Sequence, residues 1–417
     1  MIDNYLEKFI INSHKNKNFI KLAIEEVVNL SKKDKPDAKI ILISDKNIWQ
    51  NCKKYFVDYP KIYKIDKFLL KEPIADEFFL ETLLQKSKNY DFIIALGSGT
   101  VSDLCKIVAT KLEINFVTFA SAASMNAYLS RNASIKINGH KKTIPAKLPL
   151  KVFCDLEIIK NAPQKLTKAG IGDAMCFYSC WFDWFLSHKL LDYNFDKKPF
   201  LILKDKMDFL VKNYQKYSFE DLEFYQIIIE ILLISGIGMT ICGSSNPASQ
   251  SEHLIAHTID MKYPAIALNN LHGQTIAVTL MTVVKIQQQI LENFNEFYQK
   301  LKDFNINQEK HHQQRIIDFF GEEAGKESIL EYEQKLNKIK LFKDKNLTES
   351  QLQNLKKELA KILLSEPELQ KIFDYFQIQT NAKSLNLNDQ QYQKCVENAK
   401  FIRNRFGCID GITQSIN

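Results

Sequence analysis

Four short apolar runs, all within the first 160 residues, constrain the fold of this chain more than any other feature. They are rich in β-branched residues and stand at 39–45 (KIILISD), 91–97 (DFIIALG), 114–120 (INFVTFA) and 150–156 (LKVFCDL). Each run is apolar at successive positions, which is typical of parallel strands that helices cover on both faces. Helical stretches separate the runs. The pattern therefore predicts an open, doubly wound α/β domain with a parallel sheet.

The strand pattern stops after Asn161-Ala162-Pro163. The remainder has the apolar periodicity of long helices. A chain of 417 residues is also longer than one ordinary domain. We therefore predict an α/β domain at residues 1–163 and an all-helical domain at residues 164–417. The helices expected in the second domain include 174–191, 220–241, 250–262, 274–292 and 351–375.

Composition and charge exclude several classes of protein. The chain is 45% hydrophobic and 25% charged, as in ordinary soluble globular proteins. A formal charge of +7 over this length is too dilute to indicate a nucleic-acid partner. The eight cysteines include no CxxC pair, which indicates reduced thiols.

The sequence also shows no signal for secretion or membrane insertion. The amino terminus, MIDNYLEKFI, lacks the basic start and the apolar run of a secretory signal. No stretch approaches the ~18 uninterrupted apolar residues that a membrane-spanning helix needs. We expect a cytoplasmic protein without a membrane partner.

A strand-to-helix turn follows the run at 91–97, where Gly97-Ser98-Gly99-Thr100 leads into a helical stretch. Glycines let the backbone approach a ligand, and the amides and dipole at a helix start favour a pyrophosphate. Such a turn alone is more often a plain connection. It is nevertheless a candidate dinucleotide phosphate site.

Asp45 closes the run at 39–45. A carboxylate at the carboxyl end of a strand can accept hydrogen bonds from an adenosine ribose, or it can be an ordinary turn residue. In the first role it would repel the 2′-phosphate of NADP. On that reading NAD(H) is favoured over NADP(H).

The helical half carries a carboxylate and histidines at helix positions. Asp173 follows Gly-Ile-Gly, His253 and His257 stand four residues apart, and His272 opens another helical stretch. Two imidazoles and one carboxylate suit a borderline divalent metal and leave a coordination position open for substrate. Spacing alone is ambiguous, because His253 and His257 share a helix face. For His257 we weight a proton relay, a substrate contact or a hydrogen bond to a ligand above ligation.

Together these motifs resemble the glycerol-1-phosphate dehydrogenase family, within the group that contains iron-dependent alcohol dehydrogenases, glycerol dehydrogenase and 3-dehydroquinate synthase. The resemblance spans nearly the whole chain. The segments that carry it are GSGTVSDLCK (97–106), FASAASMNAYLSRNASIKINGHKKTIPAKLP (119–149), AGIGDAMCFYSCWFDWFLS (169–187), GSSNPASQSEHLIAHTIDM (243–261), LHG (271–273) and AKFIRNRFGCID (399–410).

The resemblance implies a dehydroquinate synthase-like fold and the reversible NAD(P)H-linked reduction of dihydroxyacetone phosphate to sn-glycerol 1-phosphate. It implies one divalent metal, zinc, nickel or iron, on Asp173, His253 and His272, with His257 beside them in the catalytic set. It also implies a homodimer. It places Gly97, Ser98, Gly99 and Asp103 with the cofactor phosphates, and Thr118 and Ser121 along the nucleotide. The full predicted cofactor set adds Asp45, Thr100, Ser124 and Tyr128.

Two residues depart from the family pattern. Asn126 stands where the family usually has an aspartate beside the substrate, and Gln250 replaces a usual glycine. Asparagine keeps its hydrogen-bonding capacity but cannot act as a base. Either the substrate differs from glycerol 1-phosphate, or the proton passes through another group such as His257.

The predicted substrate is a small phosphorylated polyol or ketone, with Asn126 among its contacts. Basic side chains suit the phosphate. The candidates are Lys106, Arg131, Lys136, Lys141 and Lys142, and of these Lys106 and Lys136 join Asn126 and His257 in the predicted substrate set.

Three alternatives stay open. The first is a dehydrogenase of another polyol, sugar phosphate or unphosphorylated alcohol in the same superfamily. The second, from a different class, is a catalytically silent nucleotide-binding homologue, which the missing acid at 126 would allow and the intact metal set opposes. A 3-dehydroquinate synthase is disfavoured, because that family has a glutamate where Asp173 stands.

Overall fold

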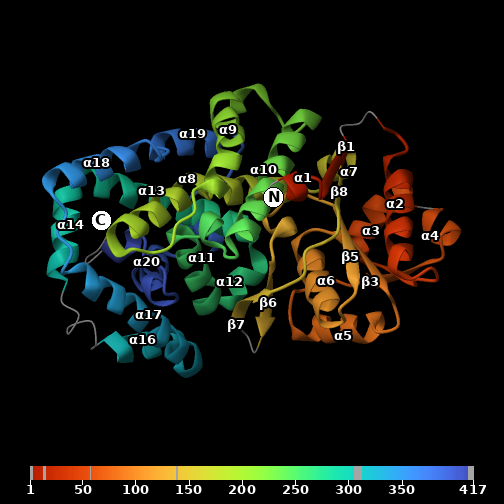
Figure 1. Ribbon diagram of the computed structural model, residues 1–417, viewed down its shortest axis with the longest axis horizontal. Helices are drawn as coiled ribbons and strands as arrows, with labels where there is room; N and C mark the ends of the chain where they lie inside the picture. Colours follow the sequence, from red (N-terminus) through yellow and green to blue (C-terminus); the bar gives the residue numbers. More distant parts are fainter. Residues whose placement is uncertain (1–2, 13–15, 57, 138–139, 305–311, 412–417) are drawn as a thin grey trace. The chain divides into compact units, whose positions relative to one another are not determined.

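The computed structural model describes residues 3–12, 16–56, 58–137, 140–304 and 312–411 (Figure 1). The chain forms two compact units, each built from two segments. The first unit comprises Met1–Ala174 and Ile202–Gly243, and the second comprises Met175–Leu201 and Ser244–Asn417. Neither unit coincides with the predicted ranges 1–163 and 164–417, because the helical segment 202–243 packs with the α/β segment.

The first unit contains a six-stranded parallel sheet in the order β1-β8-β5-β4-β2-β3. The four predicted strands are confirmed as the four interior strands of this sheet. The two edge strands were not predicted. The bounds are β1 Phe9–Asn12, β2 Ile40–Asp45, β3 Ile65–Leu70, β4 Phe92–Gly97, β5 Asn115–Ala120 and β8 Val152–Asp155.

Helices cover both faces of this sheet, which confirms the doubly wound α/β prediction. Alternate residues of β2 enter different cores: Ile40 and Leu42 pack in one, and Ile41 and Ile43 pack in the other. The first core includes side chains of α2 and α3, and the second includes those of α5 and α6. These helices are α2 Phe19–Asp34, α3 Lys46–Phe56, α5 Glu77–Ser87 and α6 Gly99–Lys111.

An antiparallel hairpin of β6 (Asn132–Ile137) and β7 (His140–Pro145) leaves the main sheet. Ala133 and Ile135 of β6 pack into the core beside α5 and α6. The remaining elements of the first unit are α1 Asp3–Leu6, α4 Tyr59–Ile62, α7 Leu156–Lys160 and α10 Leu222–Cys242.

One described helix, α10, has the length and apolar composition to cross a membrane. Within its most apolar window, 72% of the residues are buried inside the protein. Gly236 lies so close to the loop before β6 that an added Cβ would be 2.5 Å from the carbonyl oxygen of Asn126. Both observations are those of a core helix.

Among the described residues, the second unit contains helices and no strand, as predicted. The predicted helices at 174–191, 250–262 and 274–292 correspond to α8 Gln164–Leu191, α11 Ser251–Lys262 and α13 His272–Glu292. The prediction at 220–241 corresponds to α10. The prediction of one helix over 351–375 was wrong, because Ser365 and Glu368 form a capping box that starts a separate helix.

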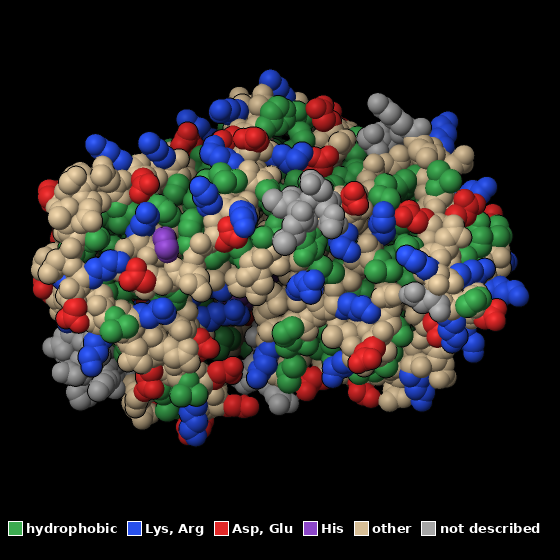
Figure 2. All heavy atoms as spheres, in the orientation of Figure 1, with side chains coloured by type: hydrophobic (Ala, Val, Ile, Leu, Met, Phe, Trp, Pro, Cys, Tyr) green, Lys and Arg blue, Asp and Glu red, His purple; other side chains and the backbone are tan. Residues whose placement is uncertain are grey.

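The other α-helices of the described residues are α9 Lys198–Asn213, α12 Pro264–Asn269, α14 Phe294–Asp303, α16 His312–Phe320, α17 Glu322–Phe342, α18 Glu349–Ala360, α19 Glu366–Tyr375 and α20 Asp389–Asn398. Acidic and basic side chains are interspersed over the face shown in Figure 2. A mixed surface of this kind agrees with the low net charge per residue.

Candidate active site

The predicted phosphate turn lies between β4 and α6. Gly97 ends the strand, Ser98 is the extended residue before the helix, and Gly99 begins α6. A Cβ added to Gly97 would lie 2.4 Å from the Cβ of Val101, so only glycine fits there. The Ser121 amide donates to the Gly97 carbonyl over 3.1 Å and ties the end of β5 to this turn.

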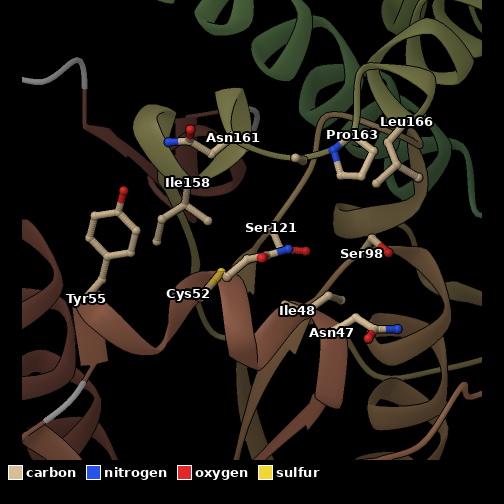
Figure 3. A pocket seen from close by; sticks show the side chains of 12 residues that line it. Asn47, Ile48, Cys52, Tyr55, Ser98, Ser121, Ile158, Asn161, Pro163 and Leu166 are labelled. Atoms are coloured by element: carbon tan, nitrogen blue, oxygen red, sulfur yellow. The ribbon is translucent and has the colours of Figure 1, made fainter.

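A cavity of about 190 Å³ opens beside this turn (Figure 3). Ser98 and Ser121, two predicted cofactor residues, line it at the carboxyl ends of β4 and β5. In open parallel sheets, ligands bind outside this edge. The other lining residues are Asn47, Ile48, Asn51, Cys52, Tyr55, Ile158, Asn161, Ala162, Pro163 and Leu166.

Asp45 is buried at the end of β2. Its Oδ1 accepts hydrogen bonds from the amides of Asn47 over 2.7 Å and Ile48 over 3.2 Å. The carboxylate therefore caps the start of α3, whose first turn lines the cavity. Asp45 thus acts as a turn residue in the structure, and its contact with an adenosine ribose stays a prediction.

Three other predicted cofactor residues support the surrounding backbone. Asp103, on α6, accepts the Ser134 amide over 3.1 Å and so ties the helix to β6. Tyr128 is fully buried and donates its hydroxyl to the Ala122 carbonyl over 2.8 Å. Burial raises the pKa of the Tyr128 phenol. A hydrogen bond with the Ser124 side chain opposes this shift and lowers the pKa.

The last two residues of the predicted cofactor set, Thr100 and Thr118, lie on α6 and β5. Thr100 is in the first turn of α6, and its side chain is half-buried. Thr118 is fully buried within β5. No contact of either with a cofactor follows from these positions, and both remain predictions.

Lys106 lies in the interior of the first unit, with an exposed fraction of 0%. Its Nζ donates to the carbonyls of Ser130 and Asn132 over 3.1 and 3.3 Å, and also to that of Ala127. Burial lowers its pKa to about 8, and the Asp103 carboxylate opposes this shift. This placement favours a role in holding the loop at 127–132 over the predicted contact with a substrate phosphate.

The other basic candidates lie on or beside the β6–β7 hairpin. Lys136 is half-buried on β6, whereas Arg131 and Lys142 are exposed. The side chain of Lys141 lies outside the described residues. These residues stay candidates for the substrate phosphate.

Asn126, the residue that departs from the family pattern, is buried and lies next to Asp173. Its backbone amide donates to Asp173 Oδ2 over 3.0 Å. The residue predicted to contact substrate and a residue predicted to bind metal are therefore neighbours.

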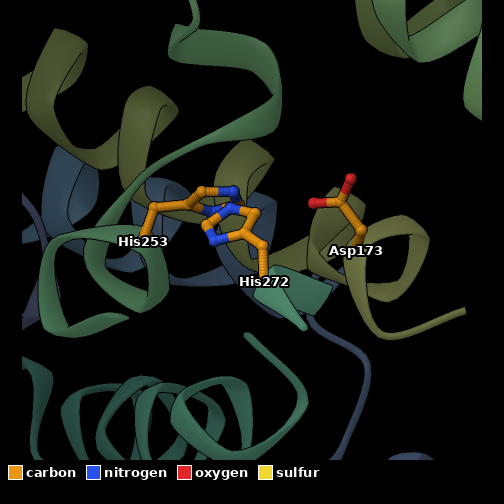
Figure 4. Close-up of side chains that lie close together, drawn as sticks. All are labelled: Asp173, His253 and His272. Atoms are coloured by element: carbon orange, nitrogen blue, oxygen red, sulfur yellow. The ribbon is translucent and has the colours of Figure 1, made fainter. Parts of the chain in front are cut away.

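The structure brings together the three predicted metal ligands. Asp173 lies in the uninterrupted helix α8, His253 lies on α11 and His272 begins α13 (Figure 4). One ligand atom from each residue lies within 4.8 Å of the others. Asp173 and His253 are buried, and His272 is half-buried.

Glu252 is the residue of this site that sequence reasoning missed. It is fully buried, and its Oε1 lies 2.9 Å from Nδ1 of His253. Burial alone would raise its pKa, but the hydrogen bond and charge of His253, with other donors, hold the pKa at about 2. A carboxylate on one ring nitrogen fixes the orientation of the imidazole, as in metal sites where the other nitrogen faces the metal. Its position directly before His253 in the sequence was the available signal.

His257 lies beside both histidines. Its ring centroid is 6.0 Å from that of His253 and 5.6 Å from that of His272, with which it stacks. Its Nδ1 is 4.0 Å from the Asp260 carboxylate. The ligand group within 4.8 Å forms from Asp173, His253 and His272, so the geometry favours a neighbouring role for His257.

The donor set fits a divalent metal. Two imidazoles and one carboxylate, largely removed from water, are the ligand types that zinc and ferrous iron take in catalytic sites with an open position. The carboxylate of Glu252 behind His253 is the outer partner that such sites usually contain.

Comparison with protein families gives a match at residues 21–163 to the model described as iron-containing alcohol dehydrogenase. The chain is 30% identical to the glycerol-1-phosphate dehydrogenase [NAD(P)+] of Pyrococcus horikoshii over 264 residues, 62% of this chain and 74% of that one. It is 35% identical to the Sulfolobus acidocaldarius enzyme of the same name over 54% of this chain.

A third enzyme of that name, from Thermococcus sibiricus, is 30% identical to the chain. The aligned region covers 63% of the Sulfolobus enzyme and 65% of the Thermococcus enzyme, which is less than two thirds of the length of either. Among solved structures, the chain is similar to a probable glycerol dehydrogenase from Sinorhizobium meliloti, with a TM-score of 0.60, 15% identity and coverage of 98% and 93% of the two chains. It is also similar to an NADH-dependent butanol dehydrogenase from Thermotoga maritima, with a TM-score of 0.58, 13% identity and coverage of 97% and 91%. These likenesses show the fold.

Proposed function

The chain belongs to the glycerol-1-phosphate dehydrogenase family of iron-containing alcohol dehydrogenases, NAD(P)-dependent enzymes that act on CH–OH groups, and on this premise we propose that it reversibly reduces dihydroxyacetone phosphate to sn-glycerol 1-phosphate. One observation carries the proposal: Asp173, His253 and His272 form a ligand group, with Asn126 hydrogen-bonded to Asp173. These contacts support a shared site for the metal and the substrate.

The proposed nucleotide site is the cavity beside Gly97 and Ser98. The start of α6 supplies backbone amides and a helix dipole for the pyrophosphate. The hydroxyls of Ser98 and Ser121 supply hydrogen bonds along the nucleotide. Asp45 lies just before the cavity-lining Asn47 and favours NAD(H) over NADP(H) through its charge.

The proposed metal ligands are Asp173, His253 and His272. A divalent cation bound there supplies Lewis acidity, which polarises a substrate carbonyl. Glu252 holds the orientation of His253 before any ligand arrives, so this part of the site is preorganised. Zinc, nickel and ferrous iron all suit the donor set.

Proton transfer is assigned to His257 rather than to residue 126. The Asn126 amide can donate and accept hydrogen bonds but cannot exchange a proton as a base. His257 lies beside the imidazoles of His253 and His272, and its Nδ1 is 4.0 Å from the Asp260 carboxylate, as in a proton relay. We propose that Asn126 orients a substrate hydroxyl while His257 supplies the proton.

The test is NADH oxidation by metal-reconstituted protein with dihydroxyacetone phosphate, run beside dihydroxyacetone and an Asp173→Ala variant. We expect turnover of the phosphorylated ketone alone and background rates in the variant. A second readout, NADH binding by fluorescence, should be unchanged in Asp173→Ala, because this residue serves the metal. Turnover of dihydroxyacetone at a similar rate would instead assign an unphosphorylated substrate.

Asn126 favours a second candidate, a dehydrogenase of a larger phosphorylated ketose in the same family. The neutral amide in place of an acid changes how a substrate hydroxyl is held. If NADH binds but dihydroxyacetone phosphate is not reduced, a panel of longer ketose phosphates tests this candidate. Restoring the acid with Asn126→Asp should then raise activity on dihydroxyacetone phosphate.

Family membership also suggests self-association, and we propose a homodimer. Sedimentation of the full chain would test it. A monomeric species at catalytic concentrations would contradict it.

A further inference from the structure

Two cysteines on α8 face the same carboxylate that orients His253. Cys176 and Cys180 are one helical turn apart, so their side chains lie on one face of the helix. Both are buried, with exposed fractions of 2% and 0%. Nothing in the proposed reaction uses either thiol.

Their contacts place four donor groups together. The Cys180 thiol donates to Glu252 Oε1 over 3.1 Å, and the two thiols are hydrogen-bonded to each other. Ligand atoms of Cys176, Glu252 and His253 all lie within 4.8 Å of one another. These residues come from α8 and α11 of the second unit.

We propose that Cys176, Cys180, Glu252 and Nδ1 of His253 form a second metal site, which takes a thiophilic divalent cation such as zinc or cadmium. Two sulfurs, one imidazole nitrogen and one carboxylate oxygen are the donors that tetrahedral zinc sites use. Paired ligands four residues apart on a helix recur in such sites. Sulfur distinguishes this set from the Asp173–His253–His272 group, because thiolates select softer metals.

The charges of the site balance when it is filled. As each metal–sulfur bond forms, the thiol releases its proton to solvent. Two thiolates and the Glu252 carboxylate then face a divalent cation. The half-buried guanidinium of Arg405, which interacts electrostatically with Cys180 and Glu252, offsets the remaining negative charge.

Sharing of His253 makes the two sites antagonists, a consequence that rests on the proposed metal ligands. A neutral imidazole has one lone pair, so it coordinates through Nδ1 or through Nε2 but not through both. A cation held by the cysteines therefore removes His253 from the Asp173–His253–His272 group. Thiophilic cations would then inhibit the enzyme by displacing a ligand.

The experiment is a titration of the metal-stripped full chain with cadmium alone, incubated to equilibrium because all four residues are buried. The readout is the ultraviolet sulfur-to-cadmium charge-transfer band. We expect the band in the wild type and its loss in a Cys176→Ser/Cys180→Ser variant. A matched Cys105→Ser/Cys395→Ser variant removes two other buried thiols and should keep the band.

Two further variants keep the result decisive. If the double variant does not fold, Cys176→Ser alone takes its place. It leaves one sulfur and should about halve the band. Asp173→Ala should keep the full band, so a failure of the proposed reaction does not affect the outcome. Absence of the band in the wild type, or its persistence without Cys176 and Cys180, would overturn the second site and leave the thiols as hydrogen-bond donors to Glu252.

Discussion

The proposed nucleotide cavity of the first unit and the buried acid network of the second unit are built by different means. The cavity is bounded by strand ends, helix starts and small hydroxyls, and the critical position, Gly97, has no side chain at all. The network contains carboxylates with no exposed surface, at Asp183 and Glu252. A buried charge costs several kcal/mol unless donors surround it. The first region should therefore respond to side-chain volume, and the second to charge and pH.

The largest effect on stability is expected for Asp183→Asn in the acid network. Oδ1 of Asp183 accepts from Gln287 Nε2 over 2.9 Å and from the Cys408 amide over 3.1 Å, and Oδ2 accepts from the amide and hydroxyl of Ser251. An amide nitrogen would face one of these donor pairs. We expect a loss of ~3 kcal/mol in the free energy of unfolding, measured with urea. The exposed Asp303→Asn on α14 is the matched control and should change stability by less than ~0.5 kcal/mol.

The pH dependence of this variant follows from the pKa of the same group. Burial raises the pKa of Asp183 to about 6, so the folded state binds its proton more tightly than the unfolded state does. This contribution to stability is present near pH 4 and is lost as the pH rises through 6. The contribution of Glu252 to stability has the opposite pH dependence. Because its pKa is lowered to about 2, that contribution is lost only as the pH falls below the ordinary range of a glutamate pKa. The difference between wild type and Asp183→Asn should shrink from pH 4.5 to 7, and a constant difference would contradict the buried-acid interpretation.

Glu252→Gln tests the charge of the network on metal binding. The amide keeps the shape but loses the negative charge that faces Nδ1 of His253. We expect metal affinity to fall roughly 10–100-fold, measured by competition with a chromophoric chelator. The exposed Glu296→Gln, which breaks only an ion pair with Lys300, is the control. Unchanged affinity in Glu252→Gln would mean that packing alone orients His253.

Gly97→Ala tests the volume rule in the first unit. The added Cβ would lie 2.4 Å from the Cβ of Val101 and 2.9 Å from both of its γ carbons. We expect a loss of ~1–2 kcal/mol in the free energy of unfolding and weaker NADH binding, with metal affinity unchanged. Gly99→Ala is the milder partner, because its Cβ would meet only the flexible Met125 side chain, at 3.1 Å. Equal effects of the two substitutions would show that the turn can move to make room.

Features with a local sequence pattern could be predicted, and contacts between distant residues could not. The four interior strands were predicted because they are apolar on both faces, whereas the edge strand β3 contains the exposed Asp66 and Lys67 and has no such signature. The three predicted metal ligands were recognisable from residue type, and His253 and His272 also from their place in the first turn of a helix, whereas Asp173 lies well inside α8. The burial of Lys106 and the meeting of Cys180 with Glu252 were not, because their partners lie 21 and 72 residues away along the chain.

The smallest effect is expected for Asp45→Asn, which removes charge at the edge of the nucleotide cavity without changing volume. Asparagine caps helices about as well as aspartate, so α3 should keep its start and the free energy of unfolding should change by less than ~0.5 kcal/mol. Loss of the charge should raise the affinity for NADPH relative to NADH by roughly tenfold, ~1.4 kcal/mol, measured by fluorescence titration. Asp76→Asn is the matched control, because Asp76 caps α5 by accepting the Phe79 amide over 3.0 Å. If neither affinity changes in Asp45→Asn, the carboxylate serves α3 alone, and charge has no part in how the first unit selects its ligand.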